Sequence, residues 1–193
     1  MILTKLLILA SESARRQKLL RDIGWEFEVR HSDVVEDVHP GMTPAYNVMR
    51  LSAEKARAVR RATDRECVIL GADTMVVIDE EVLNKPGNPV EARAMLTKLS
   101  GRAHAVYTGF TLCDIPSGRQ VSNFEVTGVR FRRLDSLEID AYIATGAPMD
   151  KAGAYGIQGD ISATFAERID GCFYNVVGLP LAKLYVTLRD FQE

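Results

Sequence analysis

One carboxylate stands inside an apolar segment, and its chemistry needs an explanation. Asp73 lies in the run Cys67–Ile78, which is rich in β-branched residues and is predicted to form a strand buried on both faces, interrupted in the middle by residues 71–74. An ionised carboxylate in such surroundings is strongly unfavourable unless a partner compensates it. We therefore expect Asp73 to have a cation, a turn or a catalytic task that accounts for its position.

A second group of polar residues follows the first predicted strand, residues 5–10. Two serines and two arginines occur within six residues there: Ser11, Ser13, Arg15 and Arg16. The free N–H groups and positive dipole end of the helix predicted to begin at this point favour an anion, and arginine can bind a phosphate through two hydrogen bonds. The alternative is a capped helix with solvated arginines, and the spacing does not separate the two.

Two lysines and a glutamate extend this set. Lys55 falls within the apolar stripe of the helix predicted over residues 43–60, so its ammonium either reaches out to solvent or points at a buried anion such as Asp73. Lys85 precedes a proline, which keeps it in an extended conformation and presents its side chain. Glu36 belongs to an acidic cluster at the end of another predicted strand.

The remaining pattern alternates strands and helices, which indicates an α/β fold. The expected strands are residues 5–10, 27–35, 67–78, 82–84, 103–113 and 120–132, with a hairpin of 165–169 and 173–177. The expected helices lie between Ser13 and Gly24, Thr43 and Arg60, Asn88 and Gly101, Asp135 and Gly146, and after Gly178 with Leu181, Leu184, Tyr185 and Leu188 inward. The loop 150–159 has three glycines in seven residues, typical of close backbone approach to a ligand or of a flexible surface loop.

Composition excludes several classes of protein. The 193 residues suit one domain or one core with two lobes, and a net charge of −2 indicates no general attraction to nucleic acid or membrane. No apolar run approaches the roughly 20 residues that span a bilayer, and no signal peptide is predicted. Three distant cysteines indicate no disulfide framework. We expect a soluble protein of the reducing cytoplasm.

The polar set also excludes several kinds of active site. It has too many cations for a glycosidase carboxylate pair, it lacks the histidine of a Ser-His-Asp triad, and the chain has neither a P-loop nor a GxGxxG run. Cations together with carboxylates suit a polyphosphate bound with a divalent metal. The residues alone therefore predict a phosphate-handling α/β enzyme.

Seven motifs in order resemble the Maf family of nucleotide pyrophosphatases along nearly the whole chain. They are residues 9–16, Arg50–Ala56, Gly71–Thr74, Lys85–Pro86, Leu99–Gly101, Lys151–Gly159 and Val177–Pro180. The resemblance implies a single domain over residues 1–193 with a fold like that of inosine triphosphate pyrophosphatase, a long mixed sheet flanked by helices, and two lobes with a central cleft. It also implies cleavage of a nucleoside triphosphate to the monophosphate and pyrophosphate with Mg²⁺ or Mn²⁺, commonly by a homodimer.

The resemblance also implies roles for individual residues. Asp73 corresponds to the catalytic carboxylate, as general base or water positioner, and with Glu36 to the metal ligands. The implied substrate-binding residues are Ser11, Arg15, Arg16, Lys55 and Lys85.

The family divides by substrate, and two positions place this chain in one branch. Thr74 and Gln158 resemble the branch acting on dTTP and UTP, and Arg15 belongs with them among the residues implied to set specificity. A neutral amide can donate to and accept from the uracil or thymine edge, whereas a carboxylate suits the donors of guanine. The function hypothesis is therefore dTTP/UTP hydrolysis, extended to modified pyrimidine nucleotides.

Two alternatives remain. One is 7-methyl-GTP hydrolysis, whose branch usually has Gln at position 74 and Glu at position 158. The other is a non-enzymatic, nucleotide-binding regulator of septum formation, against which the intact Asp73, Lys55 and Lys85 argue.

Overall fold

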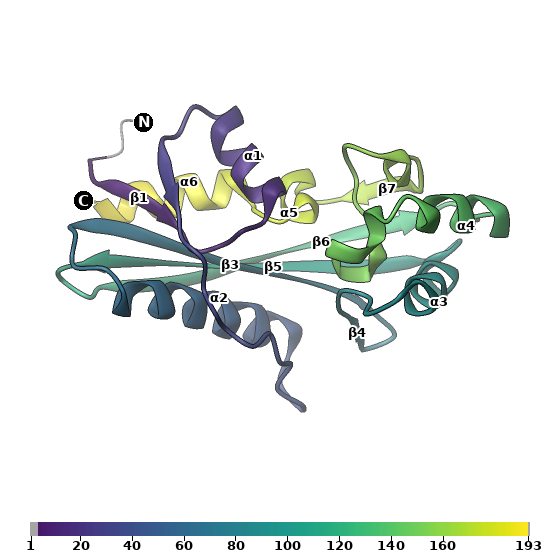
Figure 1. Cartoon of the computed structure of the whole chain (residues 1–193), viewed down its shortest axis with the longest axis horizontal. Helices are drawn as coiled ribbons and strands as arrows, with labels where there is room; N and C mark the ends of the chain where they lie inside the picture. Colours follow the sequence, from purple (N-terminus) through teal and green to yellow (C-terminus); the bar gives the residue numbers. More distant parts are fainter. Residues whose placement is uncertain (1–3, 193) are drawn as a thin grey trace. The chain divides into compact units, whose positions relative to one another are not determined.

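A computed structural model describes residues 4–192, in which seven strands form one mixed sheet of order β2-β1-β3-β5-β6-β7, with β4 paired to β3. Helices flank this sheet (Figure 1), which confirms the predicted α/β class. The described chain divides into two compact units. Unit 1 comprises residues 4–73, 108–125 and 178–192, and unit 2 comprises Thr74–Tyr107 and Val126–Val177. The single domain over residues 1–193 and the central cleft stay predictions.

The elements are distributed over both units. Unit 1 contains β1 (Leu6–Leu9), α1 (Ala14–Asp22), β2 (Phe27–Val29), α2 (Pro44–Arg61) and α6 (Leu181–Gln192). Three long strands contribute one end to each unit: β3 (Cys67–Ile78), β5 (Ala103–Ile115) and β6 (Gln120–Phe131). Unit 2 contains β4 (Glu81–Leu83), α3 (Pro89–Leu99), α4 (Ser136–Ala144), β7 (Ala166–Asp170), α5 (Phe173–Val177) and the short 3-10 helices η1 (Ala147–Asp150), η2 (Ala152–Ala154) and η3 (Ile161–Thr164).

Unit 1 has a layered architecture. Strand β1 is parallel to both β2 and β3, and parallel neighbours require crossover connections such as α1 and α2. Figure 1 shows α2 along one face of these strands and α1 and α6 along the other. The strands are consequently covered on both faces, which explains why Leu7, Ile8 and Leu9 of β1 are all buried.

Helix α2 lies unusually close to the sheet at two glycines. A Cβ atom at Gly71 of β3 would stand 2.1 Å from the carbonyl oxygen of Ser52 and 2.9 Å from the amide nitrogen of Ala56. At Gly109 of β5, a Cβ would stand 2.4 Å from the carbonyl carbon of Val48. Only residues without a side chain allow this approach, so the two glycines fix the height of α2 above the strands.

Unit 2 is built around interlocking rings. Edge-to-face contacts join Phe131 to Tyr155 at 4.7 Å, Phe131 to Phe165 at 5.9 Å and Tyr142 to Phe165 at 5.4 Å between ring centroids. His104 belongs to the same core, and its Nε2 lies 2.7 Å from the Tyr155 hydroxyl. Burial lowers the pKa of His104 to about 4, so this ring is neutral at physiological pH.

Most predicted helix ends are confirmed, but one predicted inward side chain is not. The side chains that cap helix N-termini are those of Ser13, Thr43, Asn88 and Asp135. In α6, Leu184 and Leu188 are buried as expected, whereas Tyr185 is 40% exposed, so its predicted inward position was wrong. No helix within residues 4–192 combines the length and apolar character that a membrane crossing requires.

Two predicted strands differ from the structure. Strand β2 ends at Val29 rather than near residue 35, because its neighbour β1 ends at Leu9 and offers no further ladder partner. The expected hairpin at residues 165–177 is wrong, because β7 pairs with β6 and the following segment forms helix α5. There, the buried Asn175 donates from Nδ2 to the Val106 carbonyl and the Thr127 hydroxyl, both at 2.9 Å.

We predict that Gly71→Ala destabilises the protein by more than about 3 kcal/mol, because the added methyl group overlaps the backbone of α2 and a backbone cannot rotate away. Gly128→Ala in β6 is the matched control, since its Cβ would meet the Asp170 side chain at an ordinary 3.6 Å. Urea denaturation of both variants measures the difference. Equal stabilities of the two variants would contradict the close approach of α2.

Candidate active site

The centre of the site is a buried ion pair between α2 and β3. Strand β3 runs without interruption through Gly71–Thr74, so the predicted break there was wrong. The Asp73 side chain is only 8% exposed, and its Oδ1 lies 2.6 Å from Lys55 Nζ. The Lys55 ammonium also lies 2.6 Å from Glu36 Oε1, so it bridges two carboxylates. Of the two positions considered for Lys55, the inward one is correct.

Burial and neighbouring cations act on Asp73 in opposite directions. Loss of solvent raises the pKa of the Asp73 carboxyl above its ordinary value, and this effect outweighs the lowering by Lys55 and Arg16. A carboxylate with a raised pKa accepts a proton more readily than an exposed aspartate does. The position of Asp73 therefore suits a general base as well as a metal ligand.

A buried guanidinium stands at the start of α1. Arg16 donates from Nη1 to Ser11 Oγ at 3.1 Å and from Nε to the Gly178 carbonyl at 2.9 Å. Ser13 Oγ caps the helix by accepting the Arg16 backbone N–H. Burial lowers the pKa of Arg16, while the negative charges of Asp73 and Glu36 raise it. The predicted residues Ser11, Arg16, Glu36, Lys55 and Asp73 thus form one connected group in unit 1, with Arg15 in the first turn of α1.

The other predicted residues belong to unit 2. Thr74 is half-buried on β3, and Lys85 is exposed just after β4. The glycine-punctuated loop is held against both segments, because Gly153 N–H donates to the Asn84 carbonyl at 3.2 Å and a Cβ at Gly153 would stand 3.0 Å from the Val76 side chain. The segments that carry Thr74, Lys85 and Gln158 are therefore fixed to one another within unit 2.

The predicted metal ligands have suitable chemistry. Glu36 and Asp73 offer the hard oxygen atoms that Mg²⁺ and Mn²⁺ prefer, and both contact the same Lys55 ammonium. Within residues 4–192, no three His, Cys, Asp or Glu side chains group in a way that could hold a metal ion. Two carboxylates fit a divalent ion whose remaining ligands are phosphate oxygens and water.

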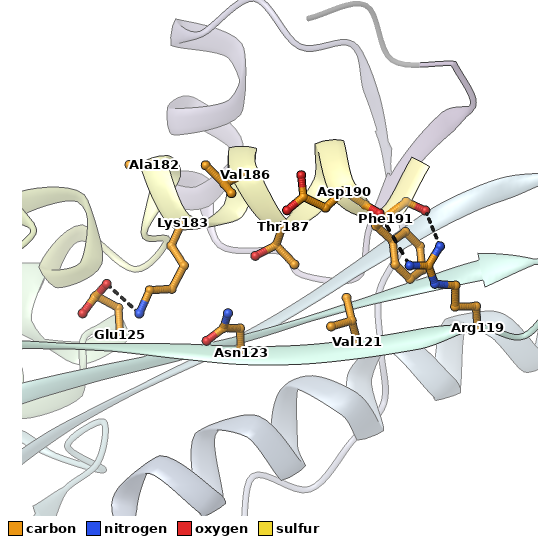
Figure 2. A pocket seen from close by; sticks show the side chains of 10 residues that line it. All are labelled: Arg119, Val121, Asn123, Glu125, Ala182, Lys183, Val186, Thr187, Asp190 and Phe191. Carbon is orange, nitrogen blue, oxygen red and sulfur yellow. Dashed lines mark hydrogen bonds and ion pairs between the residues drawn. The ribbon is translucent and has the colours of Figure 1, made fainter. Parts of the chain in front are cut away.

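A surface hollow of about 680 Å³ lies elsewhere in unit 1, between β6 and α6 (Figure 2). An ion pair of Lys183 with Glu125 at 2.9 Å stands at one end, and Arg119 donates to the Phe191 carbonyl at 3.1 Å at the other. None of the predicted site residues lines this hollow. This hollow is therefore not part of the candidate site, which we identify from the buried charges of Lys55, Asp73 and Arg16.

Sequence reasoning missed some contributors to the site. The Gly178 carbonyl, which holds Arg16, lies in a stretch noted only as a family motif. Lys151 is buried in the glycine-punctuated loop, and sequence reasoning assigned it no role. A lysine within an apolar, glycine-rich stretch indicates a buried cation, as Lys55 did within its apolar helix stripe.

Comparison with known proteins identifies the family. The model of the family described as Maf-like protein matches residues 6–191. The chain belongs to the Maf family. A dTTP/UTP pyrophosphatase of Salinibacter ruber is 49% identical over 184 residues, covering 95% of this chain and 89% of that protein. One of Carboxydothermus hydrogenoformans is 48% identical over 183 residues, covering 95% and 97%.

A solved structure is also similar to this Maf protein. It is a nucleoside-triphosphatase / dITP/XTP pyrophosphatase from Mycobacterium abscessus, which is 16% identical. The match covers 95% of this chain and 94% of that one, with a TM-score of 0.40.

We predict that Lys55→Met destabilises the protein by about 3 kcal/mol, because removing one partner leaves the other charge buried and uncompensated. Lys18→Met is the matched control, since Lys18 pairs with Asp22 at 2.9 Å on the surface and such pairs contribute about 0.5 kcal/mol or less. Denaturation of both variants at neutral pH gives the comparison. Similar, small losses in both would show that the buried pair is not the strong constraint described.

Proposed function

We propose that this Maf protein is a pyrophosphatase that hydrolyses dTTP and UTP to the monophosphate and pyrophosphate. The observation that carries the proposal is the buried pair of Asp73 and Lys55, which is joined by the more exposed Glu36, with the Arg16 guanidinium close enough to influence Asp73. The names of the similar proteins from Salinibacter ruber and Carboxydothermus hydrogenoformans support the same substrates.

The cations of the site suit a triphosphate. Such a substrate carries about four negative charges, which Arg16, Lys55 and a divalent ion can balance in a partly water-excluded site. Arg15 stands in the first turn of α1, where N–H groups and the helix dipole favour an anion. Lys85 is exposed after β4 and is proposed as a further phosphate contact.

The carboxylates suit the hydrolytic step. Water attacks one of the two phosphorus atoms joined by the oxygen that bridges the α- and β-phosphates. The bond between that phosphorus and the bridging oxygen breaks, and the products are the monophosphate and pyrophosphate. Asp73 orients this water and accepts its proton, helped by its raised pKa. Lys55 holds the Asp73 carboxylate in one position and favours its ionised form. Mg²⁺ or Mn²⁺, held by Glu36 and Asp73, would supply charge neutralisation at the phosphates.

Base selection is assigned to Thr74, Gln158 and Arg15. Gln158 carries a neutral amide on the loop that is fixed to the Thr74 segment in unit 2. An amide can both donate to and accept from a pyrimidine edge, whereas it is less suited than a carboxylate to the donor pair of 7-methyl-guanine. We further propose that the enzyme works in the cytoplasm, as its scattered cysteines suggest, and as a homodimer, as the family resemblance implies.

We predict that kcat/KM for UTP exceeds that for 7-methyl-GTP by about 100-fold or more, because 7-methyl-guanine would leave polar groups of the site without hydrogen-bond partners. Pyrophosphate release with Mg²⁺ is measured for both nucleotides, with and without a chelator. Asp73→Asn tests the catalytic role of this carboxylate. Its kcat/KM for UTP should fall at least about 100-fold while the protein stays folded.

Three outcomes of this experiment would contradict the proposal. A preference for 7-methyl-GTP would support the other branch of the family. Tight nucleotide binding without turnover would support a regulatory binding protein. Wild-type turnover by Asp73→Asn would remove Asp73 from the catalytic role.

A further inference from the structure

Three buried or half-buried polar residues surround the glycine-punctuated loop in unit 2, and none of them has a role in the proposed reaction. They are Lys151, Asp160 and Ser162, which we call the clamp. Lys151 precedes the loop's glycines, and Asp160 and Ser162 follow them. Ser162 and Lys151 contact Gly156, which lies two residues before Gln158, and Asp160 contacts both Ser162 and Lys151.

Ser162 contacts both backbone polar groups of Gly156, its N–H and its carbonyl oxygen. Its side chain is completely buried, and its Oγ accepts the Gly156 N–H at 3.0 Å and lies 2.9 Å from the Gly156 carbonyl oxygen. The same hydroxyl contacts the Asp160 carboxylate, whose Oδ1 also accepts the Ser162 backbone N–H at 2.9 Å. The hydroxyl thus accepts the Gly156 N–H, and its single proton can be donated either to the Gly156 carbonyl or to Asp160 Oδ1.

Lys151 joins the two ends of the loop. Its ammonium donates to the Ala147 carbonyl before the loop and lies 3.5 Å from Asp160 Oδ2 after it. Its aliphatic stem packs on Gly156, where a Cβ would stand 3.2 Å from Lys151 Cε. Any side chain at position 156 would therefore displace the stem of Lys151.

The residues between the clamp and Gln158 are anchored in the core of unit 2. Tyr155 and Ile157 are buried, whereas Gly156 and Gln158 are half-buried, which is the alternation of an extended segment. Tyr155 is extended in φ and ψ, and its hydroxyl lies 2.7 Å from His104 Nε2. The backbone that presents Gln158 is consequently fixed by the buried Tyr155 and Ile157 and, at Gly156, by the clamp.

We propose that Lys151, Asp160 and Ser162 are positioning residues that set the base selectivity of the enzyme by fixing the backbone that presents Gln158. The proposal rests on the proposed function, in which the Gln158 amide reads the pyrimidine edge. Hydrogen-bond discrimination depends steeply on distance and angle, so a shift of the loop weakens recognition of the correct base. None of the three residues is among those assigned to the hydrolytic step, and their hydrogen bonds and ion pairs lie within the segment that leads to and from Gln158, so the clamp is assigned to base recognition.

The test compares four single variants with the wild type, and two further variants carry Gln158→Ala, with and without Ser162→Ala. Ser162→Ala removes the hydroxyl, and Lys151→Met removes the ammonium at similar length, whereas Lys151→Arg keeps a cation. Thr164→Ala is the matched control, because it removes a hydroxyl from the same short helix η3, where Thr164 Oγ1 donates to the Ile161 carbonyl at 2.8 Å. Circular dichroism confirms folding, and kcat and KM are measured with UTP and with CTP, which has an amino group where uracil has O4.

We expect Ser162→Ala and Lys151→Met to reduce the ratio of kcat/KM for UTP over CTP by about tenfold or more, mainly through a higher KM for UTP. Lys151→Arg should restore much of the ratio, and Thr164→Ala should keep it. In a Gln158→Ala background, adding Ser162→Ala should change the ratio by less than about twofold, because the clamp then has no amide to position.

Equal losses for UTP and CTP would overturn the proposal, because they would show that the clamp only maintains structure. The same conclusion would follow if Ser162→Ala changed the ratio as strongly in the Gln158→Ala background as in the wild type. Absence of UTP hydrolysis by the wild type would instead overturn the proposed function, so the two failures are distinguishable.

Discussion

The buried ion pair of Lys55 and Asp73 is the interaction on which the site depends. Each charge alone would be strongly disfavoured in the interior, and their attraction compensates only when the two groups are in direct contact. That contact requires α2 to lie against β3, and the helix reaches this position because Gly71 has no side chain. Three residues therefore act together: Gly71 lets α2 approach β3, and this approach brings Lys55 of the helix into contact with Asp73 of the strand.

Burial of Asp73, which Lys55 compensates only in part, lowers the stability of the folded protein. Because burial raises the pKa of Asp73, its ionised form is less favourable in the folded chain than in the unfolded one. The folded state therefore loses stability as the pH rises through the ordinary pKa of an aspartate toward the raised value. Arg16 is buried in the same unit, and burial lowers its pKa. Buried charges that oppose folding in this way are characteristic of functional sites.

Several elements and the central pair could be predicted because they depend on local patterns. The N-caps at Thr43 and Asp135 follow from their own side chains and the residues just after them. Lys55 in an apolar stripe and Asp73 in an apolar strand indicated each other as partners, because either charge would be strongly unfavourable if it were buried without an opposite charge.

What could not be predicted depends on residues far apart in the sequence. The helix α5 replaces the expected strand where Asn175 binds Val106 and Thr127, which lie 69 and 48 residues away. The Asp-Gly turn signal carried no information about these contacts. Likewise, Ser162 and Gly156 are near in sequence, but the role of that hydroxyl becomes visible only when both backbone groups are seen to meet it.

The most direct test is a titration of the Asp73 carboxyl followed by carbon NMR of its side chain, with Asp73→Asn used to assign the signal. If Lys55 and burial oppose each other as described, Asp73 titrates above its ordinary pKa of 3.8 in the wild type and higher still in Lys55→Met. A pKa at or below 3.8 that does not move in Lys55→Met would contradict the account, because it would show that Asp73 is neither desolvated nor held by Lys55.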